Sequence, residues 1–128
     1  MKRKNISSGG KWEDIVGYSR AVRVGNTIFV AGTTAHSVDG VIGKDDAYTQ
    51  SIYILKKIEK ALAEAGASMN DVVQTRMYVI NIAQNSEAVG KAHGEFFKNI
   101  KPASTMVEVS SLIDPNLLVE IELTAIIK

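Results

Sequence analysis

The sequence predicts an α+β domain in which one β-sheet is covered on one face by two helices. Short segments rich in β-branched and aromatic residues alternate with two longer segments whose apolar residues recur with a helical period. The expected order is two strands, a possible short third strand, a helix, a strand, a helix and two strands, which is typical of an α+β layer. The length of 128 residues, 45% of them hydrophobic, suits a single domain over residues 1–128.

The first two strands are expected to form a hairpin. Residues 18–24 and 27–31 are β-rich, and Gly25 and Asn26 between them suit a tight turn. The short segment "GVIG" at residues 40–43 could add a third strand.

Residues 45–65 show the clearest helical pattern. Asp45 or Asp46 can cap the start of this helix and Gly66 can end it. Its apolar residues recur at helical spacing: Ala47, Ile54, Leu55, Ile58, Leu62 and Ala65. Residues 86–99 predict a second helix that ends before Pro102.

Three more strands complete the expected sheet. Residues 72–80 are rich in β-branched side chains, and residues 105–110 and 118–127 predict two strands separated by the turn-forming "DPN". The segments "NTIFVAG" and "YVINI" are apolar on both faces, although a sheet covered on one side should alternate. A second copy of the chain is therefore the expected cover for the other face. The alternative is that these are central strands with a few exposed apolar residues.

The composition disfavours several classes of function. Fifteen Lys and Arg residues nearly balance fourteen Asp and Glu residues, so no long-range field attracts nucleic acid or an anionic membrane. The absence of cysteine and the two distant histidines disfavour disulfide, redox and metal chemistry. No apolar run approaches the roughly 20 residues that span a bilayer, and the basic N-terminus lacks the apolar core of a signal peptide, so a cytoplasmic location is expected.

Four blocks cover nearly the whole chain: "GYSRAVRVGNTIFVAGTTA", "ALAEAGASMNDVVQTRMYV", the "FF" before "PAS", and "MVEVSSLIDPNLLVEIELTAII". In their order and spacing these blocks resemble the Rid family, also called YjgF, reactive intermediate deaminase or endoribonuclease L-PSP-like proteins. The resemblance implies a chorismate-mutase-like fold. It also implies a homotrimer whose sheets form a central barrel, with small-molecule sites in the clefts between subunits. Such a trimer would cover the second apolar sheet face.

Deaminating members of the family are hydrolases that need no cofactor. They add water to a 2-imino or enamino acid and release ammonia and the 2-oxo acid. Their signature arginine, two residues after a proline, holds the substrate carboxylate with paired hydrogen bonds. Pro102 and Ala103 match this signature, but Ser104 occupies the arginine position. The resemblance therefore implies a branch without the signature arginine and with reduced or altered activity.

The other site positions match the family unevenly. Tyr18 matches the pocket tyrosine, Gly32 the glycine whose backbone lies beside the ligand, and Glu120 the acid that positions or activates water. The resemblance thus makes Glu120 the expected catalytic residue. Ala31 stands where deaminating members often have serine, and Gly90 where they have asparagine.

The same residues also have ordinary structural explanations. Glu120 and Glu122 lie two residues apart on one strand, so both could be solvated side chains of one sheet face. Tyr18 could be a cross-strand packing aromatic. Trp12 could cover the cleft or anchor the N-terminal arm.

Four further residues are candidates for contacts with a ligand. Arg76 could supply the missing cation, although a strand arginine more often meets a carboxylate such as Glu108 or Glu120. His93 could act as an acid or base near neutral pH, or could be a packing or surface residue of its helix. Ser104 and Thr105 could bind a ligand by hydrogen bonds, or Ser104 could cap the strand start.

Three classes of function remain open. The first is a hydrolase acting on an imine, an enamine or a related C–N compound. The second is a non-catalytic trimeric protein that binds a small molecule such as an imino or oxo acid. The third is the endoribonuclease or translation-inhibitor activity attributed to some relatives, which the balanced charge disfavours because phosphate contacts supply most nucleic-acid affinity. A serine cannot replace charged hydrogen bonds worth about 1.5–3 kcal/mol each, so weak activity on ordinary 2-imino acids is expected.

Overall fold

The computed structural model describes residues 1–128. Five short strands come first along the chain, and two helices then alternate with the remaining strands. In chain order they are β1 (Arg3–Ile6), the π-helical turn η1 (Glu13–Gly17), β2 (Ala21–Val24), β3 (Thr27–Thr33), β4 (His36–Ser37), β5 (Gly40–Val41), α1 (Ala47–Glu64), the 3-10 turn η2 (Met69–Asp71), β6 (Val72–Val79), α2 (Ile82–Phe97), β7 (Ala103–Glu108) and β8 (Val119–Ile126).

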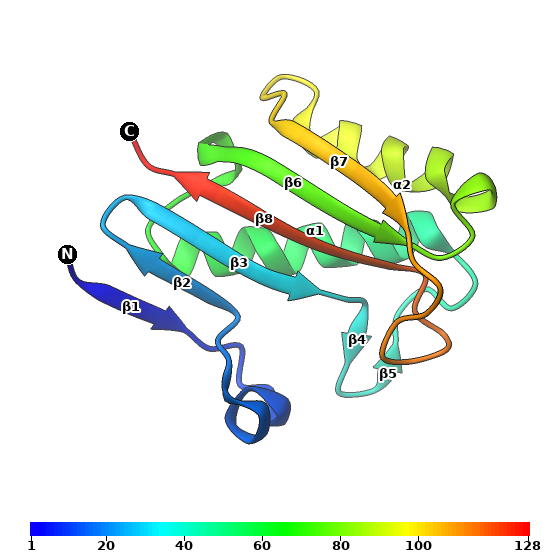
Figure 1. Cartoon of the computed structure of the whole chain (residues 1–128), viewed down its shortest axis with the longest axis horizontal. Helices are drawn as coiled ribbons and strands as arrows, with labels where there is room; N and C mark the ends of the chain where they lie inside the picture. Colours follow the sequence, from blue (N-terminus) through cyan, green and yellow to red (C-terminus); the bar gives the residue numbers. More distant parts are fainter.

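Six of the strands form one mixed sheet, in the order β1-β2-β3-β8-β6-β7. Only β6 and β7 pair in parallel, because α2 connects them and returns the chain to the same end of the sheet. Both helices lie on one side of this sheet (Figure 1). The predicted α+β architecture, one mixed sheet with two helices on one face, is therefore confirmed.

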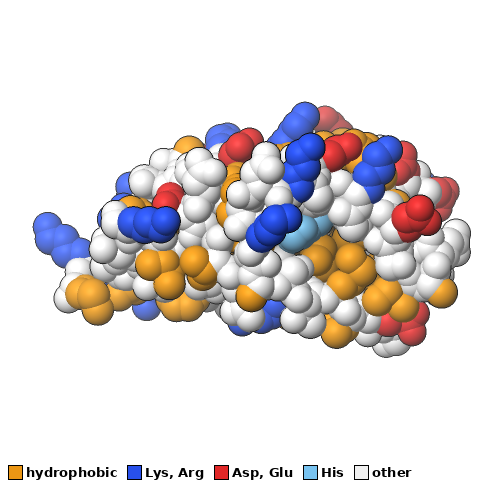
Figure 2. Space-filling view, turned by 90° about the horizontal axis from the view of Figure 1, so that it is seen from above, with side chains coloured by type: hydrophobic (Ala, Val, Ile, Leu, Met, Phe, Trp, Pro, Cys, Tyr) orange, Lys and Arg blue, Asp and Glu red, His pale blue; other side chains and the backbone are white.

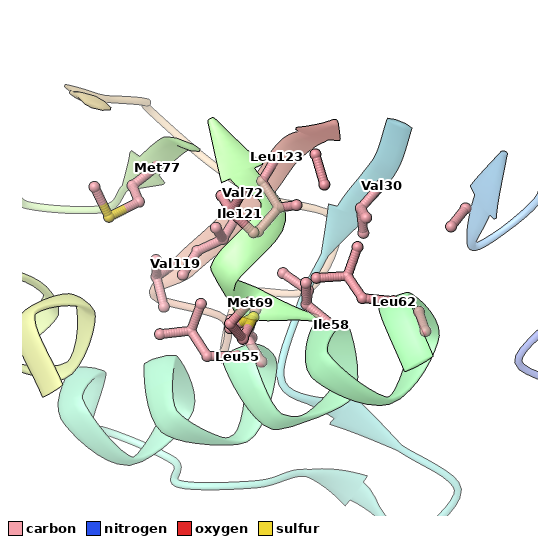
Figure 3. Close-up of a cluster of buried hydrophobic side chains, with 14 of the residues drawn as sticks. Val30, Leu55, Ile58, Leu62, Met69, Val72, Met77, Val119, Ile121 and Leu123 are labelled. Atoms are coloured by element: carbon pink, nitrogen blue, oxygen red, sulfur yellow. The ribbon is translucent and has the colours of Figure 1, made fainter. Parts of the chain in front are cut away.

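The core lies between α1 and the sheet, as Figure 3 shows. Leu55, Ile58 and Leu62 of α1 are buried there, facing sheet residues such as Val30 and Ile121. The helix begins one residue after Asp46, whose side chain accepts a hydrogen bond from the Thr49 backbone at 3.0 Å. Capping and the apolar stripe thus explain why this helix was predictable from the sequence.

The main differences from the prediction are in three predicted elements and one strand that was not predicted. The predicted third strand exists as β5, but it pairs with β4 in a separate two-stranded sheet. The second helix begins at Ile82 instead of residue 86, directly after Asn81, whose backbone is left-handed with φ of 50°. The hairpin strand β2 begins at Ala21 instead of residue 18, because the π-helical turn runs to Gly17. The edge strand β1, which carries Arg3, Lys4 and Asn5, was not predicted.

The face of the sheet opposite the helices is open (Figure 1). Phe29, Val107 and Ile126 lie on this open face and are 53%, 41% and 45% exposed. Hydrophobic side chains also form several separate patches on the surface that Figure 2 shows. This open face is the one for which the sequence predicted a cover, and a homotrimer remains a prediction. No helix of the structure is long and apolar enough to cross a membrane.

Candidate functional site

Glu120 lies on β8 beside a bulge in the neighbouring strand β3. The regular pairing of β3 with β8 is interrupted between Val30 and Thr33, which leaves Ala31 and Gly32 out of register. A Cβ atom added to Gly32 would overlap Oε2 of Glu120 and would lie 3.0 Å from its Cδ. The Glu120 carboxylate therefore occupies the space that any other residue at position 32 would need for its side chain.

Arg20 contacts the same glycine through its backbone carbonyl. Its Nη2 donates a hydrogen bond to the Gly32 carbonyl at 2.8 Å, while its Nε is buried without a hydrogen-bond partner. The guanidinium carbon lies 5.6 Å from the centroid of the Tyr18 ring, which is cation–π distance. Tyr18, Gly32 and Glu120 are thus brought to one place, and Arg20 is the cation among them.

Burial raises the pKa of the Glu120 carboxyl above its ordinary value. The positive charge of Arg20 lowers this pKa and the negative charge of Glu122 raises it, and the net shift is upward. A carboxyl group with a raised pKa can hold or release a proton closer to neutral pH, as a general acid or base requires. Glu120 is therefore chemically suited to the role expected for it.

Glu122 lies on the same face of β8, two residues further on. The Tyr78 hydroxyl donates a hydrogen bond to its carboxylate, and this bond, together with burial, raises the pKa of Tyr78. Arg76 is in register with Glu122 across the strands, but its Nη2 donates to Gln74 Oε1 at 2.8 Å.

The carboxylates expected as partners for Arg76 have other neighbours. Glu120 is in register with Tyr78, and Glu108 accepts a hydrogen bond from the Ile82 backbone at 3.1 Å. Arg76 therefore lies two residue pairs away from Glu120 along the β6–β8 ladder, and the guanidinium group that influences the Glu120 pKa is that of Arg20.

A cleft of about 630 Å³ lies between the N-terminal segment and the open sheet face. Tyr18, Phe29, Ala31 and Glu122 are among the residues that line it. Trp12 is not among them; it is 53% exposed, with the Lys11 Nζ 5.1 Å from its ring. The tyrosine expected in a pocket therefore lines a cleft, whereas within one chain Trp12 does not cover it.

Ser104, Thr75 and His93 form a second group, on the side of the sheet that faces α2. The fully buried Thr75 donates a hydrogen bond from Oγ1 to Ser104 Oγ at 2.9 Å, and the same oxygen lies 2.8 Å from His93 Nε2. The His93 ring packs on Phe97, with centroids 4.7 Å apart, and burial lowers the pKa of His93. His93 is thus a packed, hydrogen-bonded side chain coupled to the serine at the signature position.

The sequence-predicted site residues fall into two places within one chain. Tyr18, Gly32 and Glu120 gather around Arg20, whereas Ser104 and His93 gather around Thr75, near the β7 edge. The strand β6 separates β7 from β8. Thr105 is in register with Arg76 on β6. A cleft that unites both groups across two subunits remains a prediction.

Sequence reasoning missed Arg20 and Thr75. The signal for Arg20 was its position two residues after Tyr18 in an extended segment, which puts both side chains on one face. Thr75 gave no signal, because a threonine in a β-branched strand is an ordinary strand residue. No group of three or more His, Asp or Glu side chains is placed to hold a metal ion.

Comparisons with known proteins cover almost the whole chain. The family model described as Endoribonuclease L-PSP matches residues 11–127. An uncharacterised protein of Streptomyces coelicolor is 35% identical over 122 residues, which are 95% of this chain and 90% of that protein. A RutC family protein of Pyrococcus abyssi is 38% identical over 109 residues, 84% of each chain.

A solved structure from Mycobacterium tuberculosis is described as a member of the highly conserved YjgF/YER057c/UK114 family. It is 46% identical to this chain, with a TM-score of 0.89 over 98% of this chain and 100% of that one. A structure from Yersinia pestis, described as a member of the conserved Rid protein family, is 30% identical with a TM-score of 0.86 over 98% of this chain and 100% of that one. The chain therefore belongs to the endoribonuclease L-PSP family, the Rid or YjgF family, and has its chorismate-mutase-like fold.

Proposed function

We propose that this chain forms a homotrimer that hydrolyses a small imine, enamine or related C–N compound in clefts between its subunits, with Glu120 as the proton-transferring group. The observation that carries this proposal is the Glu120 carboxyl itself. It is half-buried, its pKa is raised mainly by that burial, and it lies against the backbone of Gly32. Carboxyl groups whose pKa is shifted by burial and by neighbouring charges cluster at functional sites.

The proposed reaction has two steps for an imine. Water adds to the carbon of the C=N bond while Glu120 takes a proton from the water, and the nitrogen receives that proton. Glu120 then takes the proton of the new hydroxyl group as the C=O bond forms, and the amine leaves with that proton as ammonia. One imine and one water become one carbonyl compound and one ammonia, and Glu120 returns to its starting state.

Arg20 has a positioning role in this proposal. Its hydrogen bond to the Gly32 carbonyl holds the bulge at which the glycine meets the carboxylate. Its charge also limits the rise of the Glu120 pKa, so that the carboxylate form remains accessible for accepting a proton.

The trimer is supported by the open sheet face. Phe29, Val107 and Ile126 are large apolar side chains, and each is more than two-fifths exposed in the isolated chain. Burying them against other copies of the chain would remove apolar surface from water.

The direct test is ammonia release from imines generated by an amino-acid oxidase in an amine-free buffer, together with enamine and other C–N substrates. Glu120→Gln should lower turnover at least about a hundredfold, in keeping with the usual contribution of a general acid or base. Glu59→Gln, which changes an exposed carboxyl on α1, is the matched control and should leave turnover unchanged. Equal turnover in Glu120→Gln and the parent would overturn the proposal.

A non-catalytic binding protein is the second candidate, and Ser104 is the observation that favours it. Deaminating relatives have at this position an arginine that holds the substrate carboxylate. This chain has the hydroxyl of Ser104 there, and that hydroxyl is already hydrogen-bonded to Thr75. Calorimetric binding of small oxo compounds without ammonia release from any imine would support this candidate over the enzyme.

RNA cleavage is the least supported function, even though the family description names it. The chain has a net charge of +1, so it offers little of the phosphate attraction on which RNA affinity depends. We expect only weak, salt-sensitive RNA binding in a filter-binding assay at physiological salt. Submicromolar binding that one surface patch controls would contradict this expectation.

A further inference from the structure

We propose that Ser104, Thr75 and His93 form an uncharged anchor that selects a substrate bearing a neutral carbonyl group, such as an amide or ester, over one bearing a carboxylate. This inference deepens the proposed function and rests on it, because it assigns the end of the substrate that lies away from Glu120. It differs from that function in naming the substrate class.

The proton positions in this group follow from the two contacts of Thr75. A threonine hydroxyl has one proton, and Thr75 donates it to Ser104 Oγ at 2.9 Å. The contact of 2.8 Å between Thr75 Oγ1 and His93 Nε2 must then be donated by His93, which carries its proton on Nε2. The hydroxyl proton of Ser104 is left free for an acceptor on a ligand. The anchor is thus a directed chain of donors that ends at Ser104.

Such a chain strengthens the last donor without adding charge. Hydrogen bonds in series polarise one another, and Thr75 is fully buried, where that effect is largest. Ser104 itself is an exposed residue of β7, at the surface of the isolated chain. Burial lowers the pKa of His93, which keeps the ring uncharged at neutral pH.

The absence of charge decides which ligand fits. A carboxylate needs charged or multiple donors to replace the water it loses, and one hydroxyl leaves most of its lone pairs unmatched. A neutral carbonyl oxygen loses far less on leaving water and is satisfied by one strong donor. The anchor therefore disfavours acids and accepts amides or esters.

Binding of matched probes to the full-length protein tests this inference without relying on turnover. Pyruvamide and pyruvate have nearly the same shape and differ in charge. We expect the parent protein to bind pyruvamide at least about tenfold more tightly than pyruvate in calorimetric titrations at neutral pH. Thr75→Val keeps the shape of the side chain and removes its hydroxyl, and should weaken pyruvamide binding about three- to tenfold, the usual effect of one neutral hydrogen bond.

Rescue and reversal variants separate this role from a purely structural one. Thr75→Ser restores the hydroxyl and should restore the preference for pyruvamide, whereas Ser104→Ala should lose it. Ser104→Arg should reverse the preference toward pyruvate.

The inference is overturned if the parent prefers pyruvate, if pyruvamide does not bind at millimolar concentrations, or if Thr75→Val leaves the preference unchanged. A preference for pyruvate would indicate Arg20 as the anion-binding group, and Arg20→Gln should then abolish it. Failure of the proposed hydrolase function can be told apart from failure of this inference. In the first case the protein would release no ammonia but would still prefer pyruvamide.

Discussion

The carboxylate of Glu120 lies directly against the Cα of Gly32, across the β3–β8 bulge. The Glu120 carboxyl can take this position only because Gly32 has no side chain. The carboxyl group is half-buried beside the glycine, and burial is the main cause of its raised pKa. A side chain at position 32 would compete with the carboxylate for this space.

Gly32→Ala tests this coupling. The added methyl group would overlap the Glu120 carboxylate, and because that group is the flexible end of its side chain, the carboxylate should swing away. We expect ammonia release to fall at least about tenfold, since a small misplacement of a catalytic group is costly. The free energy of unfolding should change by less than about 1.5 kcal/mol.

The matched control is Gly94→Ala on α2. A Cβ at Gly94 meets nothing within 4 Å. Replacing a helical glycine by alanine should stabilise the protein by about 0.5–1 kcal/mol in chemical denaturation and leave activity unchanged. If Gly32→Ala keeps full activity, the contact between Gly32 and Glu120 has no catalytic role.

The sequence indicated only part of the group around Glu120. A family resemblance marked Glu120 and Gly32 as candidates, and the period-2 alternation of "VEIEL" puts Glu120 and Glu122 on one face of the strand. The proximity of Arg20 to both depends on the pairing of β2, β3 and β8 and on the bulge between β3 and β8, which no local pattern encodes. Long-range register therefore limited the prediction of the site.

The open sheet face should hold the subunits together. Light scattering and sedimentation should give three times the mass of the chain at micromolar concentration. Phe29→Glu places a charge on the open face and should shift the protein toward monomers, because a buried charge without a partner is costly. Val38→Glu changes a fully exposed residue between β4 and β5 and should leave the trimer intact. A stable monomer of the parent chain would contradict the expected assembly.

His93 should make stability depend on pH. Burial depresses its folded-state pKa below the unfolded value of 6.5, so the unfolded chain takes up the proton more readily. The stability from neutral His93 is present above that unfolded value and is lost as pH falls through the lower folded pKa. Between about pH 7.5 and pH 5, at fixed protein concentration, the free energy of unfolding of the parent should fall more than that of His93→Gln.

His36→Gln is the control for this measurement, because His36 is exposed on β4. Its unfolding free energy should follow the parent over the same pH range. Identical pH dependence of the parent and His93→Gln would show that the contact of His93 with Thr75 and Phe97 does not perturb its protonation.

The fold was predictable where a local signal existed. The helix α1 has both a cap at Asp46 and a regular apolar stripe, and its bounds lie within two residues of the prediction. The strand β1 has neither; it consists mostly of polar residues and exists because it pairs with β2, from Arg3 opposite Val24 to Ile6 opposite Ala21. Tertiary pairing overrides weak strand propensity there.

Ser104→Arg tests whether this position explains weak activity on ordinary 2-imino acids. An arginine two residues after Pro102 would offer two parallel N–H donors and a charge to a substrate carboxylate, where serine offers one uncharged donor. The strand edge is exposed, so the longer side chain has room, although Thr75 loses one of its two hydrogen-bond partners, at a cost of about 1 kcal/mol in stability.

We expect this variant to release ammonia faster than the parent from 2-imino acids made by an amino-acid oxidase. The gain should be partial, because Ala31 and Gly90 also lack the polar side chains of deaminating relatives, and positioning depends on the whole shell. The double variant Ser104→Arg with Glu120→Ala should lose the gain, which ties the new activity to the same carboxyl group. If the parent already matches Ser104→Arg at full activity, another cation holds the substrate carboxylate. Arg20, whose buried Nε has no partner beside Glu120, is then the residue to replace before Arg76, whose guanidinium is bonded to Gln74.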